Sequence, residues 1–66
     1  MIQKWYYPSE HLPVADEYIF FRPVGYDGKY VKGWIDPSSN YFYSEATLVG
    51  WPAYLVQKWR YDTYVP

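Results

Sequence analysis

The sequence predicts a mainly β protein, a small antiparallel meander of roughly three to five short strands. Asp27-Gly28 separates two runs rich in β-branched and aromatic residues within 17–35, and Asp-Gly between such runs is a strong hairpin signal. Phe, Trp and Tyr, which favour strands, make up 26% of the residues.

Before the hairpin, residues 1–7 predict a short strand that Pro8 ends, because proline cannot donate to a strand ladder. Residues 8–16 contain Pro8 and Pro13 and read as a loop. Leu12 and Val14 are apolar residues in this loop, and we expect them to pack under the sheet.

A two-residue type I′ turn at Asp27-Gly28 is expected to pair Phe20 with Ile35 and Phe21 with Trp34. Bulky side chains then occupy both faces, with Tyr18, Phe20, Val24, Val31 and Ile35 on one and Ile19, Phe21, Tyr30 and Trp34 on the other. Hydrophobic alternation alone specifies such a register poorly, and it does not say which face is exposed. Pro23 indicates that the first strand is an edge there or loses its outer partner.

After the hairpin, residues 36–40 predict a turn and residues 41–43 a third strand, antiparallel to residues 30–35. The stretch 44–50 predicts one short helical turn that Ser44 caps and Gly50 ends. Residues 53–61 alternate like a last strand, and a short helix beginning at Pro52 is the alternative.

Residues 1–66 are expected to form one small domain. The chain has no Cys and one His, so neither a disulfide framework nor a structural zinc is expected to stabilise it. Its ten Tyr, four Trp and three Phe must then supply most of the core. So small a core cannot hold all these rings, and we expect several at the surface, where Tyr and Trp are enriched in binding sites.

The residues do not predict an enzyme. His11 is the one imidazole, the serines adjoin turn signals, and the carboxylates are scattered along the chain. No spacing of acids and His fits a metal site, and no Gly-rich stretch fits a phosphate. We therefore expect no catalytic residues, no metal ligands and no cofactor.

Six basic and seven acidic residues give a net charge of −1, which argues against binding to duplex nucleic acid. Lys58, Trp59 and Arg60 form the one basic-aromatic stretch, and they support single-stranded nucleic-acid binding as an alternative function. No apolar run is long enough to span a bilayer, and residues 1–7 do not resemble a signal peptide. A cytoplasmic location is expected.

The chain resembles a small phage- and prophage-associated family of unknown function. The family opens with the motif W-x4-[DE]-x-L-P, which Trp5, Glu10, Leu12 and Pro13 match. It closes with V-x-x-W before a short Pro-containing tail; Val56 and Trp59 match the motif, and Pro66 ends the chain. Residues 60–62 stand where the family commonly has a proline. The resemblance implies a phage or mobile-element setting and no particular activity.

A second resemblance is to the WW domain, which binds Pro-rich peptides on aromatic rings. Trp34, residues 36–38, residues 41–43, Thr47 and Trp51 carry it. The two Trp residues lie closer together than in that family, and Pro52 directly follows Trp51. A WW-like binder of Pro-rich peptides is therefore a further alternative.

The leading hypothesis is a non-enzymatic protein-binding module that acts through a Tyr and Trp face of its sheet. By the first resemblance, it would be a phage-encoded accessory protein that inhibits a host component, for example in host defence. The partner would be an unidentified host protein, and the same surface could instead join two copies in a homodimer. The expected anchors are Tyr26, Tyr30, Tyr41 and Tyr43.

Overall fold

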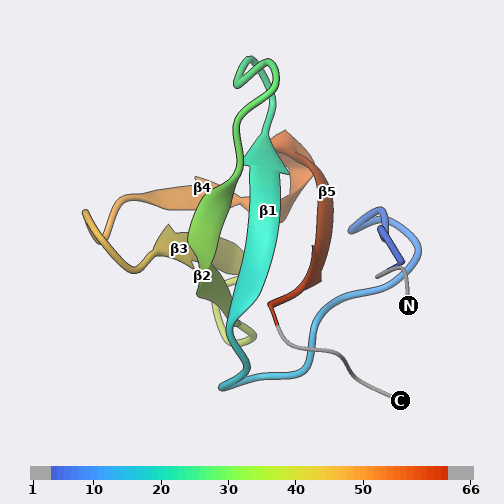
Figure 1. Cartoon of the computed structure of the whole chain (residues 1–66). Coiled ribbons are helices and arrows are strands. Elements are labelled where there is room, and N and C mark those ends of the chain that lie inside the picture. Colours follow the sequence, from blue (N-terminus) through green and yellow to red (C-terminus); the bar gives the residue numbers. More distant parts are fainter. Residues whose placement is uncertain (1–3, 63–66) are drawn as a thin grey trace.

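The structure is a computed structural model that describes residues 4–62, and it confirms a mainly β fold. The described residues form one five-stranded antiparallel sheet with the strand order β4-β3-β2-β1-β5 (Figure 1). The elements, in chain order, are β1 (Ile19–Pro23), β2 (Val31–Asp36), β3 (Tyr41–Ser44), β4 (Gly50–Pro52), the 3-10 helix η1 (Ala53–Leu55) and β5 (Val56–Tyr61).

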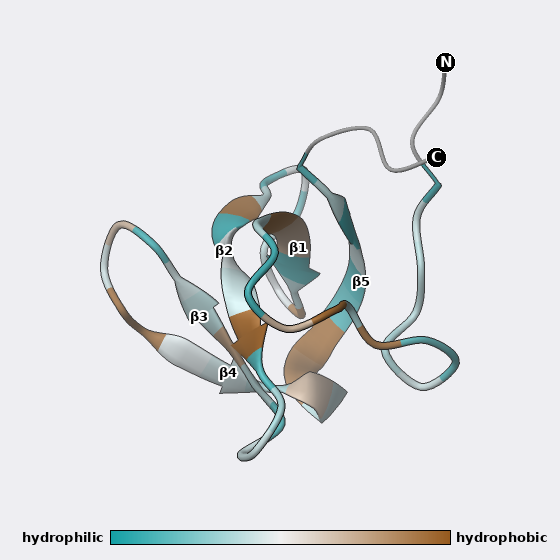
Figure 2. Cartoon of the chain, turned by 90° about the horizontal axis from the view of Figure 1, so that it is seen from below, coloured by the Kyte–Doolittle hydropathy of each residue, from teal (hydrophilic) through white to brown (hydrophobic). Residues whose placement is uncertain are grey.

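Strands β1 to β4 form a meander, in which each strand pairs with the next along the chain. The chain then turns through η1, and β5 returns to pair with β1. This return makes β1 a central strand and leaves β4 and β5 at the two ends of the sheet. Seen from below, the strands curve around the core instead of lying flat (Figure 2).

The core lies on one face of this curved sheet. Alternate residues of β1, Ile19 and Phe21, are fully buried, and Trp59 of β5 is also 0% exposed. The rings of Phe21 and Phe42 lie 5.3 Å apart. The buried cluster consists of Ile19, Phe21, Ile35, Phe42, Val56 and Trp59. The aromatic core expected from the composition is therefore built mainly from three rings and three aliphatic side chains.

The hairpin of β1 and β2 exists, but its predicted turn and register are wrong. Phe21 pairs with Val31 and Phe20 with Lys32, so nine residues, 22–30, separate the paired segments. The N–H of Tyr26 donates to the carbonyl of Pro23, and the N–H of Lys29 donates to that of Tyr26. These are two successive turns with a glycine at the third position of each, at φ 92° for Gly25 and 70° for Gly28. Positive φ at that position alone is the type II pattern, not type I′.

In the observed register, the residues of β1 that share a face with Ile35 are the opposite set from those predicted. Ile19 and Phe21 share the buried side with Ile35, whereas Phe20 faces outward beside Lys32. The predicted register would have placed Phe20 with Ile35. Burial of Ile19, Phe21 and Ile35 in one core selects the register, and the length of the β1–β2 loop follows from that register.

As a whole β1 lies between β2 and β5, but at Pro23 it is an edge, as predicted, because its pairing with β2 ends at Phe21; its outer partner, β5, is retained with an irregularity. The pairing of β1 with β5 shifts between Arg22 and Pro23, where Lys58 and Val56 are the respective partners. This is a β-bulge that leaves Gln57 as the extra residue. The bulge accommodates the missing proline N–H within a central strand, because pairing with β2 has already ended at Phe21.

The elements after β2 follow the prediction in part. The turn before β3 forms, with a 2.9 Å bond from the N–H of Asn40 to the carbonyl of Asp36, and β3 pairs with β2 as expected. No helix is assigned at 44–50, but the predicted single turn capped by Ser44 forms: the N–H of Thr47 donates to the Ser44 hydroxyl at 3.3 Å, and the N–H of Leu48 donates to the Ser44 carbonyl at 2.8 Å. The turn ends at Leu48, at φ 58°, instead of Gly50, which begins β4.

The two interpretations of residues 53–61 are each correct for one part. Pro52 precedes the 3-10 turn of η1, and β5 follows from Val56. At the other end of the chain, Tyr6 forms an isolated bridge with Trp59 instead of a strand over 1–7, of which residues 1–3 lie outside the described part. Leu12 and Val14 are exposed, at 42% and 61%, so neither packs under the sheet.

Candidate functional site

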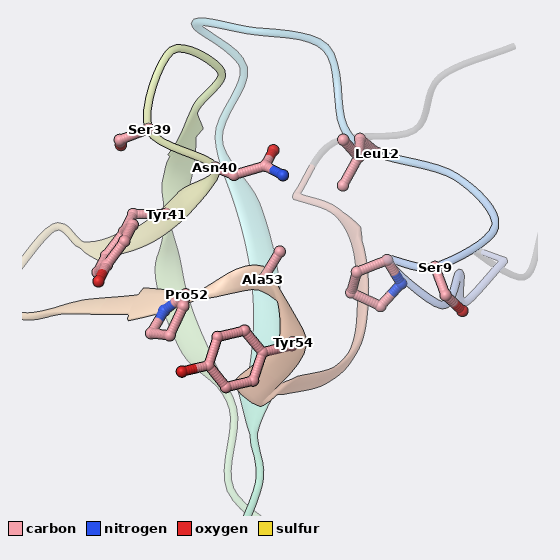
Figure 3. Close-up of a pocket in the computed structure, with 9 residues that line it drawn as sticks. Ser9, Leu12, Ser39, Asn40, Tyr41, Pro52, Ala53 and Tyr54 are labelled. Carbon is pink, nitrogen blue, oxygen red and sulfur yellow. The ribbon is translucent and has the colours of Figure 1, made fainter.

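A groove of about 500 Å³ lies between the loop after Tyr7 and the segments that flank β3 and β4 (Figure 3). Leu12 and Ser9 line one side, and the rings of Tyr41 and Tyr54 line the other, beside Pro52; Pro8 also lines the groove. Ser9, Ser39, Asn40 and Ala53 complete its wall. None of these side chains carries a charge.

Strand pairing positions the tyrosine side of the groove. Phe42 is buried in the core, so its neighbour Tyr41 projects from the other face of β3. Tyr41 is paired with Pro52 across β3 and β4, and the N–H of Ala53 donates to the carbonyl of Asn40 at 2.9 Å. These contacts hold the start of η1 against the start of β3, and η1 then presents Tyr54 with 82% of its surface exposed.

The β2–β3 turn is fixed by one carboxylate. Asp36 accepts bonds from the Ser38 hydroxyl at 2.8 Å and the Ser39 hydroxyl at 2.9 Å, and from the backbone N–H of Ser38. Hydrogen bonds from the Ser38 hydroxyl first, and then from the Ser39 hydroxyl, lower the pKa of Asp36 from its ordinary value. Because the same turn carries Ser39 and Asn40 into the groove wall, this network holds part of the site in place.

The groove can bind an uncharged, extended ligand. Tyrosine rings and prolines offer apolar contact surface, and the tyrosine hydroxyls and the Asn40 amide offer a few hydrogen bonds. Its lining includes no imidazole, carboxylate or ammonium group, and its ionisable side chains are the phenols of Tyr41 and Tyr54.

The four predicted tyrosine anchors do not form one face. Tyr41 and Tyr43 stack on each other with centroids 6.1 Å apart. Tyr26 instead packs edge-on against Trp51 at 5.7 Å, and Tyr30 stacks on Trp5 at 4.7 Å. Of the four, Tyr41 lines the groove. Tyr41 and Tyr43 are two residues apart in β3, so they project from the same face and stack. Tyr26 and Tyr30 lie in the β1–β2 loop, which is longer than predicted and brings each to a different partner.

Tyr54 is the groove's second tyrosine, and the sequence did not single it out as a binding residue. Residues 53–61 predict a strand, in which the exposure of Tyr54 would depend on which face of the strand points to the core. The available signal was Pro52, because proline in a first helical turn predicts that the next residues leave the sheet.

The predicted basic-aromatic stretch is divided between two environments. Trp59 is 0% exposed and belongs to the core, so its ring cannot stack on a nucleic-acid base. Lys58 and Arg60, its neighbours in β5, project from the other side of the strand and are half-buried. The burial of Trp59 therefore argues against the single-stranded nucleic-acid alternative, in which this ring would stack on a base.

His11 has a structural environment. Its ring stacks on Tyr6 at 4.7 Å and lies 5.8 Å from the ring of Trp59. Within residues 4–62, no group of three or more His, Asp or Glu side chains is arranged to hold a metal ion. The same part of the chain contains no helix with the length and apolarity needed to cross a membrane.

Comparisons with protein-family models, curated proteins and solved structures find no match for this chain. The resemblance to the phage-associated family therefore stays a prediction. Function has to be argued from the groove and from the charged and aromatic surfaces of the sheet.

Proposed function

We propose that the chain is a non-enzymatic protein-binding module that takes a short, extended, proline-containing segment of a partner protein in the groove. The single observation that carries this proposal is that two tyrosine rings, Tyr41 and Tyr54, line the same uncharged groove beside Pro52 (Figure 3). Tyr54 is 82% exposed although it is a large ring, and such rings are enriched at binding surfaces.

Proline fits this groove for a physical reason. A proline-rich segment adopts the polyproline II helix, which is extended before binding and therefore loses little entropy on docking. Its rings pack against aromatic side chains, and its carbonyls can accept hydrogen bonds from tyrosine hydroxyls. Tyr41, Tyr54 and the Asn40 amide supply these two kinds of contact.

Addition of a partner strand to the sheet is a poorer alternative at this edge. Strand β4 has three residues, and one of them, Pro52, has no N–H to donate. A partner here would gain few backbone hydrogen bonds. Side-chain contacts in the groove must therefore supply most of the affinity.

The resemblance to the phage-associated family supports a setting for this activity. We propose that the module is a phage-encoded accessory protein, that it works in the host cytoplasm, and that its partner is a host protein which it inhibits. Small size and the absence of catalytic spacing in the sequence are consistent with action by binding alone.

Titration of the protein with a decaproline peptide, followed by amide NMR, tests the proposal. We expect chemical-shift changes to concentrate at Asn40, Tyr41, Ala53 and Tyr54, with weak affinity, about micromolar to millimolar, for this unoptimised probe. Replacement of one exposed ring, Tyr54→Ala, should weaken binding about tenfold, which corresponds to loss of roughly 1.4 kcal/mol.

Tyr18→Ala is the matched control, because Tyr18 is 48% exposed and does not line the groove. It should bind decaproline like the unmodified protein. A glycine-serine peptide of equal length should produce no shifts at the groove. Decaproline binding that Tyr54→Ala leaves unchanged, or shifts confined to other surfaces, would refute the groove as the site.

A further inference from the structure

A second surface, which shares no residue with the groove, covers the outer side of β1 and β5. We call it the basic-aromatic face and define it by six residues: Trp5, Phe20, Arg22, Tyr30, Lys58 and Arg60. Three of the six are cations, although the chain as a whole has a net charge of −1. Positive charge is therefore concentrated here by the fold.

Strand register assembles this face. Phe20 and Arg22 alternate with the buried residues of β1, and Lys58 and Arg60 lie on either side of buried Trp59 in β5. Across the two strands, Phe20 is paired with Arg60 and Arg22 with Lys58. Side chains that are opposite each other in neighbouring strands project side by side from the same face, so they form two adjoining cross-strand pairs.

Aromatic rings hold two of the cations in place. The Lys58 ammonium lies 4.9 Å from the centroid of the Trp5 ring, and the Arg60 guanidinium carbon lies 5.1 Å from it. The same guanidinium carbon is 5.2 Å from the centroid of Phe20. Cation–π contacts of this kind orient the charges without neutralising them.

Among the described residues, no carboxylate forms an ion pair with Lys58 or Arg60. The chain's ion pairs within residues 4–62 join Arg22 to Asp27 at 3.4 Å and Lys32 to Asp62 at 3.6 Å, and neither involves Lys58 or Arg60. In addition, Arg60 Nε is buried and donates to no acceptor in the described part of the chain. Because Nε is enclosed, a carboxylate on this face would bond to the terminal Nη atoms of the guanidinium instead.

We propose that the basic-aromatic face binds an extended acidic segment of a partner protein. Residues two apart in a strand project from the same face about 7 Å apart, which is also the spacing of side chains at alternate positions of an extended peptide. Carboxylates at such positions can therefore meet Lys58 and Arg60 together. Arg60 adds a planar guanidinium, which suits bidentate contact with a carboxylate.

An acidic protein segment fits this face better than single-stranded nucleic acid. Base stacking needs an aromatic ring with an accessible face. Trp5 already stacks on Tyr30 at 4.7 Å and is approached by both cations, and the ring of Phe20 is approached by Arg60. The faces of these rings are therefore already in contact with other side chains of the protein. A base would have little free ring surface to stack on, whereas a carboxylate can contact the cations directly.

Titration with an acetylated hexaglutamate peptide, followed by amide NMR at low salt, tests this inference. We expect shifts at Lys58 and Arg60, and an affinity that falls as salt is added, because salt screens attraction between charges at the protein surface. The variant Lys58→Gln should weaken binding about threefold, and Lys58→Gln with Arg60→Gln at least about fivefold. Decathymidylate should bind more weakly than hexaglutamate.

Lys29→Gln is the matched control, because it removes one positive charge from the exposed β1–β2 loop and should leave binding nearly unchanged. Tyr54→Ala should also bind hexaglutamate normally, so this result is independent of the groove's function. If the double variant fails to fold, Lys58→Gln alone decides the question. Absence of hexaglutamate binding, equal loss in Lys29→Gln and Lys58→Gln, or tighter binding of decathymidylate would overturn the proposal.

Discussion

The indole Nε1 of Trp59 donates a 2.9 Å hydrogen bond to the backbone carbonyl of His11, 48 positions earlier in the chain. Backbone bonds between Tyr6 and Trp59 run in both directions, at 2.8 and 2.9 Å. One fully buried residue therefore anchors the N-terminal segment to the core. Since that segment also supplies Pro8 and Leu12 to the groove, Trp59 connects the stability of the sheet to the shape of the site.

Replacing this residue by Trp59→Phe keeps a ring in the core but removes the N–H donor. We expect the free energy of unfolding to fall by about 2 kcal/mol, from the lost hydrogen bond together with a small cavity. Chemical denaturation measures this loss. The control Trp34→Phe, at a half-buried position on the outer face, should cost less than about 0.5 kcal/mol. Equal losses in the two variants would show that the bond to His11 contributes little.

Composition and turn signals were enough to predict the antiparallel meander and a last strand within residues 53–61, but not the pairing of that strand with β1. Tyr41–Ser44 and the turn before it follow from local residues. The pairing of β5 with β1 depends on contacts between distant residues, which local patterns do not encode. The hairpin register failed for a related reason, because both faces of Ile19–Pro23 and Val31–Asp36 carry bulky residues and only the assembled core selects between them.

The corrected register makes a direct prediction about Phe20 and Phe21. Phe21 is 0% exposed in the core, whereas Phe20 faces outward beneath Arg60. Phe21→Leu should therefore lower the free energy of unfolding by about 1–2 kcal/mol, and Phe20→Leu by less than about 0.5 kcal/mol. Parallel denaturant titrations compare the two variants. A greater cost at Phe20 would favour the register with the two-residue turn.

The candidate site was predicted less well than the fold. Tyr41 was identified from its place in an aromatic run, and its exposure follows from the alternation of β3. Tyr54 became visible only when η1 replaced the start of the expected strand. Lys58 and Arg60 were already visible in the sequence as a basic-aromatic stretch, but their assembly with Phe20 and Arg22 could not be predicted, because it depends on the pairing of β5 with β1.

Gly33 is the position where a single methyl group should be least tolerated. A Cβ atom there would overlap the backbone carbonyl of Tyr43 and would lie 3.2 Å from Ser44 Cα. Backbone atoms cannot move aside without breaking the pairing of β2 and β3, so Gly33→Ala should cost at least about 3 kcal/mol. Thermal denaturation should show a largely unfolded chain.

Gly28→Ala provides the comparison for this prediction. Gly28 lies at φ 70° in open space, so an alanine there meets no atom and experiences only the strain of the left-handed conformation, about 1–2 kcal/mol. A Gly33→Ala variant as stable as Gly28→Ala would contradict the close approach of β2 and β3.

The last prediction concerns pH and the β2–β3 turn. Hydrogen bonds from the hydroxyls of Ser38 and Ser39 stabilise the ionised form of Asp36 and lower its pKa in the folded protein. A depressed folded-state pKa means that the contribution to stability is present above the unfolded-state pKa and is lost as the pH falls through the folded-state pKa. A carboxyl-detected NMR titration should therefore find Asp36 ionised below the ordinary aspartate range. Ser38→Ala with Ser39→Ala should return its pKa toward the ordinary value, and an unchanged titration in that variant would exclude the hydroxyls as the cause.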